Sequence, residues 1–273
     1  MATQQGTLTF DVEVGRKLEA IYATPDAVTR RRAALDAVQA QPGENGLDIG
    51  PGPGFLACEL ARQVGPTGRV ATVDNNPTML AMTQQRALDQ GLSDRIDLHQ
   101  SDAATLPFPD GAFDFVVASQ VYEYVAGIEQ ALAEAWRVLR PGGRLVIIDT
   151  DWDTLVIHAD DVELTARINR AWDEHLAHRT LPQRLPSLLS QAGFKGTVAR
   201  LVPVLSTEHH ADTYGYGLIG LMANFARGRA GVDDRDVDSW LADIDRQNAG
   251  RGYFFSLNQY LFSATRPDAR TGI

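Results

Sequence analysis

Short apolar runs alternate with longer amphipathic stretches between about residue 45 and residue 150. The apolar runs predict five strands, at Gly46–Ile49, Arg69–Val73, Ile96–His99, Phe113–Ala118 and Arg144–Asp149. The amphipathic stretches between them predict three helices, at Phe55–Val64, Pro77–Gln90 and Ile128–Leu139. Strands that alternate with helices indicate βαβ units and therefore a parallel sheet.

The pattern changes on both sides of this core. Helices are predicted at residues 11–40, 160–178, 185–194 and 212–248, and strands at Val198–Leu205 and 253–266. We therefore expect one α/β domain with an N-terminal helical arm. Two helical insertions are expected at about 151–182 and 206–250.

A glycine-rich turn follows the first predicted strand, in the stretch "GLDIGPGPG" at 46–54. In an open parallel sheet, ligands bind beyond the carboxyl ends of the strands. Glycine there lets the backbone approach a ligand closely and adopt positive φ angles. Asp74 ends the second strand, where a carboxylate can accept both hydroxyl protons of a ribose. The two features together indicate a ligand that contains adenosine.

The spacing of these glycines separates two classes of nucleotide ligand. A dinucleotide-binding turn has the pattern G-x-G-x-x-G, with the pyrophosphate at the start of the first helix. Gly50, Gly52 and Gly54 instead form G-x-G-x-G, with prolines between them. The turn therefore departs from the dinucleotide pattern, and other positions must decide the ligand.

Four motifs in order decide it: "LDIGPGPG", "VDNNPTML", "SDAATLPFPDGAFDFV" and "LRPGGRLVI". Their spacing resembles the class I S-adenosylmethionine-dependent methyltransferases, and more narrowly the small-molecule branch that includes the ubiquinone/menaquinone-biosynthesis type. The resemblance implies a Rossmann-like fold, with a seven-stranded, mostly parallel sheet whose last strand is antiparallel. It also implies a helical arm over residues 1–44 and a methyltransferase domain over 45–273.

The same resemblance assigns residues to S-adenosylmethionine, with S-adenosylhomocysteine as the product. The implied cofactor-binding residues are Tyr22, Arg31, Asp48, Gly50, Gly52, Gly54, Asp74, Asn75, Asp102, Ala103, Ser119 and Gln120. The glycines would cradle the methionine part, Asp48 would hold its ammonium group, and Arg31 would pair with its carboxylate. Arg30 and Arg32 are alternatives to Arg31.

Several of these residues also have a purely structural interpretation. Asp48 can be a buried acid satisfied by backbone N–H groups, Asp74 and Asp102 can be helix caps, and Arg31 can belong to a solvated helix face.

The implied reaction is an in-line methyl transfer to oxygen, nitrogen or carbon of a small organic acceptor. We predict Tyr122, Asp151 and His158 as catalytic residues, with helix capping as the alternative for the acid. Two histidines and Glu174 in "WDEHLAHR" have a spacing that can hold a metal. A solvated helix face is the favoured interpretation of that spacing, and no metal is expected.

Composition narrows the class of protein further. The net charge of −10 argues against nucleic acid as a partner, since phosphate binding needs a basic surface. A single cysteine, Cys58, fits a reducing cytoplasm. No apolar run approaches the roughly 20 residues that span a bilayer, and the N-terminus has no signal-peptide pattern. We expect a cytoplasmic monomer or homodimer with a small-molecule substrate and no stable membrane insertion.

Two alternative functions remain. The chain can bind S-adenosylmethionine for a reaction other than methyl transfer, because the cofactor site would look alike. A nicotinamide-dependent oxidoreductase is disfavoured by the glycine spacing and by the final aromatic strand.

Overall fold

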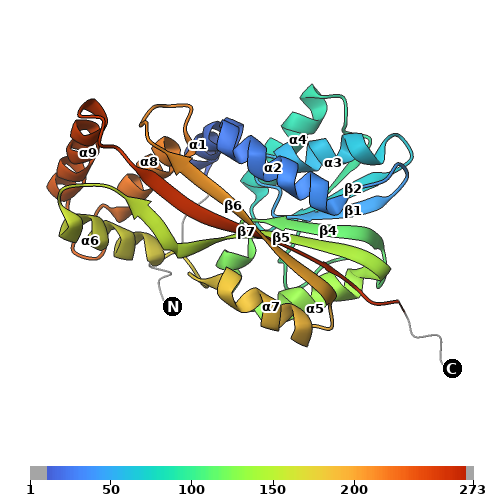
Figure 1. Cartoon of the computed structure of the whole chain (residues 1–273). Helices are drawn as coiled ribbons and strands as arrows, with labels where there is room; N and C mark the ends of the chain where they lie inside the picture. Colours follow the sequence, from blue (N-terminus) through green and yellow to red (C-terminus); the bar gives the residue numbers. More distant parts are fainter. Residues whose placement is uncertain (1–10, 269–273) are drawn as a thin grey trace, which may run out of the picture.

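The computed structural model describes residues 11–268, and these form a single seven-stranded sheet (Figure 1). The strands are β1 (Asn45–Ile49), β2 (Arg69–Asp74), β3 (Ile96–Gln100), β4 (Phe113–Ser119), β5 (Leu139–Ile157), β6 (Lys195–Ser206) and β7 (Phe255–Thr265). Their order across the sheet is β3-β2-β1-β4-β5-β7-β6. Neighbours among β1 to β5 pair in parallel, while β7 is antiparallel to both β5 and β6. The predicted sheet and its antiparallel last strand are confirmed.

Helices cover both faces and one end of this sheet (Figure 1). They are α1 (Val12–Ala23), α2 (Pro25–Val38), α3 (Phe55–Val64), α4 (Pro77–Asp89), α5 (Ile128–Val138), α6 (Val162–Asp173), α7 (Leu181–Gln191), α8 (Tyr214–Ala226) and α9 (Asp234–Ala249). In the view of Figure 1, α2, α3 and α4 lie above the sheet and α5 and α7 below it, while α6, α8 and α9 gather at its left end. The predicted arm corresponds to α1 and α2 as far as the structure describes it, since residues 1–10 lie outside the described part.

The strand β5 is much longer than its predicted range Arg144–Asp149. The sequence predicts that the strand ends at Asp149 and that a helical insertion begins at about 151, yet Asp149 and Asp151 are buried and the strand continues through them. Pairing with β7 explains the continuation, because Asp151 lies opposite Asn258 and Ile157 opposite Phe255. The predicted first insertion therefore begins with a strand rather than a helix.

The extended ends of β5, β6 and β7 support a hydrophobic core of their own. This core joins α6, α8 and α9 to the strands, and its largest fully buried side chains are Trp240 and Phe255. A second core, around Ile128 and Leu132 of α5, packs on one face of the parallel strands, and a third, around Leu60 of α3, packs on the other. The helices at the end of the sheet are thus anchored separately from the parallel half.

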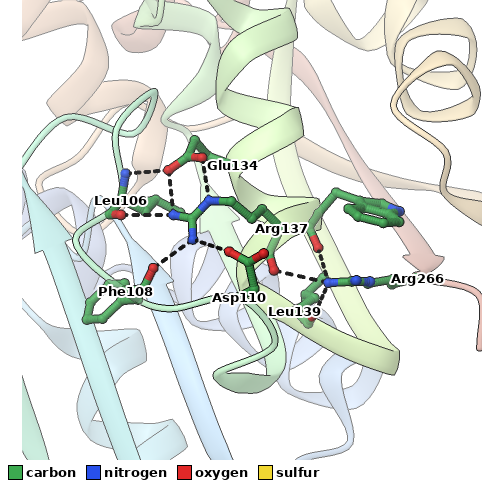
Figure 2. Close-up of polar contacts among 8 residues, drawn as sticks. Leu106, Phe108, Asp110, Glu134, Arg137, Leu139 and Arg266 are labelled. Atoms are coloured by element: carbon green, nitrogen blue, oxygen red, sulfur yellow. Dashed lines mark hydrogen bonds and ion pairs between the residues drawn. The ribbon is translucent and has the colours of Figure 1, made fainter. Parts of the chain in front are cut away.

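A guanidinium network fixes the connection between β3 and β4 to helix α5 (Figure 2). Arg137 donates to the carbonyl oxygens of Leu106 and Phe108 at 3.0 and 2.7 Å, and to the carboxylates of Glu134 and Asp110 at 2.7 and 2.9 Å. Glu134 in turn accepts the backbone N–H of Leu106 at 2.8 Å. The connection that carries residues 102–104 is therefore fixed to helix α5.

No helix within residues 11–268 is long and apolar enough to cross a membrane.

Candidate active site

A cavity of about 720 Å³ opens at the carboxyl ends of the parallel strands. That edge is where an open α/β sheet binds its ligands. Nine residues predicted to bind the cofactor line this one cavity: Tyr22, Gly50, Gly52, Asp74, Asn75, Asp102, Ala103, Ser119 and Gln120. The structure thus brings together residues from the arm, from the turn after β1, and from the ends of β2, β3 and β4.

The turn between β1 and α3 has a backbone that only glycine adopts easily. Gly50, Gly52 and Gly54 have φ angles of +65°, +53° and +81°. A Cβ at position 54 would lie 2.8 Å from the Cα of Thr83 in α4, so Gly54 also permits close helix packing. At Gly52 the nearest atom would be 3.6 Å away, on the Tyr22 ring. The turn therefore leaves open space at Gly52, with the ring of Tyr22 across from it.

Asp74 ends β2 at the edge of the cavity, where the sequence predicts a contact with ribose hydroxyls. Its Oδ1 accepts the backbone N–H of Asn76 at 2.9 Å, and a backbone N–H of Gly52 also stabilises its charge. Burial nevertheless raises the pKa of Asp74 to about 6. Asn76, not Asp74, caps helix α4, because its side chain accepts the N–H groups of Thr78 and Met79. Asp74 is thus left to face the cavity.

Asp102 and Ala103 form the adjoining wall, after β3. The Asp102 carboxylate accepts the backbone N–H of Ala104 at 2.7 Å, which makes a tight turn and not a helix start. Asp102 is exposed and Ala103 is buried, so a flat apolar group can lie against Ala103 with a polar edge toward Asp102.

Gln120 connects three elements at the centre of the cavity. It has a φ of +56°, and its side chain donates to the hydroxyls of Thr150 in β5 and Tyr214 in α8 at 3.0 and 3.3 Å. Its side-chain oxygen accepts a hydrogen bond from Arg30 of α2. Gln120, which the sequence predicts as a cofactor-binding residue, therefore also ties the arm and α8 to the sheet.

Three predicted cofactor residues do not line the cavity: Arg31, Asp48 and Gly54. The Arg31 guanidinium donates to Glu59 at 3.2 Å and to the carbonyl oxygen of Tyr22. Asp48 lies in β1 below the glycine turn, fully enclosed, and its Oδ2 has no hydrogen-bond partner among the described residues. Burial, followed by the charge of Asp74, raises the pKa of Asp48. This unpartnered carboxyl group fits a cationic group bound above the turn.

The other half of the cavity is aromatic and apolar. Its walls come from α1, from the segment after β4, from β5, and from the helices at the end of the sheet; among them are Ile21, Tyr124, Trp152, Trp172, His175 and Leu218. No lysine or arginine lines the cavity among the residues that the structure describes. This half can enclose a neutral ring or hydrocarbon group.

The three predicted catalytic residues lie elsewhere. Tyr122 is fully buried in the core below the site, Asp151 accepts a hydrogen bond from Gln183 at 2.9 Å, and His158 is exposed. None of the three lines the cavity. The neighbour of Tyr122, Tyr124, does line it.

Residues of the insertions were the ones that sequence reasoning missed. Trp172 and His175 were assigned to a polar-faced helix, yet both are buried and both line the cavity. The sequence predicts a helix as far as residue 178, whereas α6 ends at Asp173 and the residues after it turn toward the cavity. Within residues 11–268, no group of three or more His, Cys, Asp or Glu side chains is arranged to hold a metal ion.

Comparison with known proteins agrees with this geometry. Residues 47–147 match a family described as a methyltransferase domain. An uncharacterised 37.1 kDa protein from a Streptomyces fradiae transposon is 35% identical over 215 residues, which cover 77% of this chain and 59% of that protein. The ubiquinone/menaquinone biosynthesis C-methyltransferase UbiE of Hahella chejuensis is 40% identical over 119 residues, covering 44% of this chain and 48% of that protein. The chain thus spans less than two thirds of the length of these curated relatives.

Solved structures share the fold at lower sequence identity. The [4+2]-cyclase SpnF is 24% identical with a TM-score of 0.58, and the match covers 89% of this chain and 81% of that one. Phosphoethanolamine N-methyltransferase 2 of Haemonchus contortus, in complex with S-adenosyl-L-methionine, is 18% identical with a TM-score of 0.62; the match covers 95% of this chain and 58% of that one. The family match covers residues 47–147, whereas the similarity in fold to these structures covers 89% and 95% of this chain.

Proposed function

We propose that this chain, which belongs to the class I S-adenosylmethionine-dependent methyltransferases, transfers the methyl group of S-adenosylmethionine to a small, uncharged and largely apolar acceptor. The observation that carries the proposal is one cavity with two unlike halves. One half has the glycine turn and Asp74, and the other has aromatic walls without a cationic side chain.

Cofactor binding would use the polar half. Asp74 would accept the ribose hydroxyls, Ala103 and Asp102 would contact the adenine, and the turn at Gly50 and Gly52 would follow the methionine part. The unpartnered Oδ2 of Asp48 supports a role in holding the ammonium group, directly or through water. Arg31 would act from behind the site, by fixing Tyr22 through its backbone carbonyl.

The contribution of the protein to the reaction would be alignment and exclusion of water. The bound cofactor supplies a methyl group on a cationic sulfur that leaves as a neutral thioether. Gln120 and Ser119, at the end of β4, would set the position of the donor, while Trp152 and Trp172 would hold the acceptor flat against it. Because charge disperses during the transfer, a dry cavity that fixes the reacting atoms in line favours the reaction.

The experiment has two arms. Calorimetry with S-adenosylhomocysteine tests the polar half, and a transfer assay with isotope-labelled methyl donor tests the reaction on a panel of neutral phenols, quinols, amines and carboxylic acids. We expect binding of the nucleoside and label in neutral aromatic products. Binding without label in any product, or label only in charged amines, would contradict the proposed acceptor class.

A second candidate is a reaction that keeps the methyl group on the cofactor. The observations that favour it are the fold shared with the [4+2]-cyclase SpnF and the enclosed aromatic half of the cavity. The same assay separates the two, because the second candidate predicts converted acceptor that carries no label and no formation of S-adenosylhomocysteine.

Location and assembly are part of the proposal. A cytoplasmic location and a monomeric or homodimeric state stay predictions from the sequence. Light scattering of the purified chain gives the assembly state directly.

A further inference from the structure

We propose that Arg30 of α2 is a positioning residue for the methyl transfer, because its guanidinium fixes the orientation of the Gln120 side chain at the centre of the cavity. The inference rests on the proposed function and goes beyond it, since Arg30 itself does not line the cavity. From the sequence, Arg30 was only an alternative to Arg31 for a ligand carboxylate. Four features of its surroundings support the new role.

The first is a buried charge without a carboxylate partner. Arg30 is 4% exposed. Its neighbour Arg31 pairs with Glu59 at 3.2 Å, whereas Arg30 forms no ion pair with any carboxylate in the part of the chain that the structure describes. An apolar side chain would fill the same space without the cost of burying a charge. Stability alone therefore does not explain an arginine at this position.

The second is the set of groups that the guanidinium contacts instead. Its Nη1 atom donates to the side-chain oxygen of Gln120. Its central carbon, Cζ, lies 5.1 Å from the ring centroid of Tyr22 and 5.6 Å from that of Tyr214, which is within the range of cation–π contacts. All three partners line the cavity. Arg30 therefore supports wall residues from the arm, from the end of β4 and from α8.

The third is the conformation of Gln120. Its φ of +56° lies in a region that residues other than glycine rarely adopt, and such a conformation persists only where contacts hold it. A guanidinium can only donate hydrogen bonds, so the amide oxygen must face Arg30. The amide nitrogen then faces the hydroxyls of Thr150 and Tyr214, at 3.0 and 3.3 Å. Arg30 thus selects one of the two orientations of the amide.

The fourth is that the partners on the other side are fixed. Thr150 of β5 and Gln259 of β7 are fully buried and lie opposite one another in the sheet. Gln259 donates to the Tyr214 hydroxyl at 3.4 Å, and the backbone N–H of Tyr214 donates to Asp26 in the first turn of α2 at 3.4 Å. The sheet and α8 therefore form a rigid frame, to which Arg30 adds the contact from the arm.

The expected role follows from the place of Gln120 beside the proposed donor. Without Arg30, its amide could turn, since the amide oxygen would lose its charged donor. The Tyr22 ring would lose the cation above it, and this ring lies 3.6 Å from the position of a Cβ at Gly52. Because methyl transfer depends on alignment of the reacting atoms, binding and reaction would suffer although every residue that lines the cavity remains.

The test is a double-mutant cycle measured by calorimetry with S-adenosylhomocysteine. The variants are Arg30→Met, Gln120→Met and the two together, with Arg32→Met as the control, because Arg32 is exposed on the same helix. We expect each of the first two variants to bind about tenfold more weakly than the wild type, as the loss of one charge-assisted hydrogen bond predicts. Arg32→Met should bind like the wild type.

The pair decides whether Arg30 acts through Gln120. Adding Arg30→Met to Gln120→Met should weaken binding by less than about threefold, since the contact that Arg30 makes with the amide is already gone. A purely structural role would give the same loss in both backgrounds. Additive losses, or an effect of Arg30→Met no larger than that of Arg32→Met, would overturn the proposal.

A measurement on the wild type covers the case in which Arg30→Met does not fold. Nitrogen spectra of ¹⁵N-arginine-labelled protein separate the two Nη atoms of a guanidinium that rotates slowly, and Arg30→Lys identifies the signals of Arg30. We expect two separate signals that shift on addition of S-adenosylhomocysteine, and a single unmoved signal for Arg32. One averaged signal for Arg30, or signals that the nucleoside does not move, would contradict the proposal.

The two proposals fail in different ways. If S-adenosylhomocysteine produces no heat with the wild type, the proposed methyl transfer fails. If the nucleoside binds to the wild type and the losses in the cycle are additive, the methyl transfer stands and the role of Arg30 fails.

Discussion

The Cα of Thr83 lies 2.8 Å from the point that a Cβ at Gly54 would occupy. The Thr83 hydroxyl also donates to the carbonyl oxygen of Gly52 at 2.8 Å. Helix α4 is therefore packed directly on the glycine turn, and the shape of the turn depends on the absence of a side chain at position 54.

The first prediction concerns that contact. Gly54→Ala should destabilise the protein by about 1–2 kcal/mol through its φ of +81°, and by about 1–3 kcal/mol more because α4 must move. S-adenosylhomocysteine affinity should fall as well, since the turn faces the cavity. Urea denaturation and calorimetry measure the two effects.

Gly91→Ala is the matched control, because Gly91 also has a positive φ, +66°, but has no atom within 4 Å of the added Cβ. It should lose only about 1 kcal/mol and keep its affinity for the nucleoside. Equal losses in the two variants would show that the contact with Thr83 is unimportant.

The second prediction concerns pH and cofactor affinity. Burial raises the pKa of Asp74 to about 6 in the free protein, and ribose hydroxyls bind best to the charged carboxylate. Affinity for S-adenosylhomocysteine should therefore fall as the pH drops through this value, by about tenfold between roughly pH 7 and pH 5. Asp74→Asn should bind weakly and with little dependence on pH. If the pH profile is the same in wild type and variant, Asp74 is not the group that binds the ribose.

The third prediction concerns the network of Figure 2. Arg137→Gln removes the donors that hold Leu106, Phe108 and Asp110 against α5. We expect a loss of about 1–3 kcal/mol in the free energy of unfolding, because partly buried carbonyl oxygens lose charged donors. Hydrogen exchange should rise in residues 102–112.

Arg227→Gln serves as its control. This arginine also binds two carboxylates, Asp234 and Asp238, but at an exposed helix start. Its effect on unfolding should be clearly smaller, and exchange at 102–112 should be unchanged. A larger effect at Arg227 than at Arg137 would contradict the assigned role of the network.

The fourth prediction concerns the buried acid beside the site. Glu123 accepts the backbone N–H of Thr150 and the indole N–H of Trp152, at 3.1 and 3.3 Å. Burial raises its pKa above the usual value of a glutamate, and also raises that of Asp149. The folded state therefore binds more protons than the unfolded state between the unfolded and folded pKa values. Stability should fall as the pH rises through that window, from about pH 5 upward.

Glu123→Gln keeps an oxygen for both donors and cannot ionise. Urea denaturation across this pH range should show a shallower slope for the variant than for the wild type. Glu13→Gln, at an exposed position of α1, should leave the slope unchanged. An identical slope in wild type and Glu123→Gln would show that another group causes the pH dependence of stability.

Much of the parallel half was predictable because its signals are local. Helix α3 has its predicted bounds, since Gly54 precedes it and buried apolar positions recur along it at helical spacing. The glycine turn and the acid that ends β2 lie within 30 residues of one another in sequence, and sheet topology alone brings them to one edge.

The aromatic half of the cavity depends on contacts between distant segments, which a sequence pattern does not contain. Alternating acids concealed the continuation of β5, whose burial comes from pairing with β7. A spacing of acid and histidines suggested a solvated helix around His175, but the helix ends before it and the chain turns into the cavity. Arg31 was assigned to a ligand carboxylate, because nothing local indicated that Glu59 lies beside it.

The separate core under α6, α8 and α9 has a consequence for how such enzymes diversify. Those helices rest on the far ends of β5, β6 and β7, beyond the strands that carry the glycine turn and Asp74. Exchange of this end between relatives would replace the compound that is modified while the donor machinery stays intact. The architecture therefore allows the helices at one end of the sheet to be replaced without a change in the parallel strands.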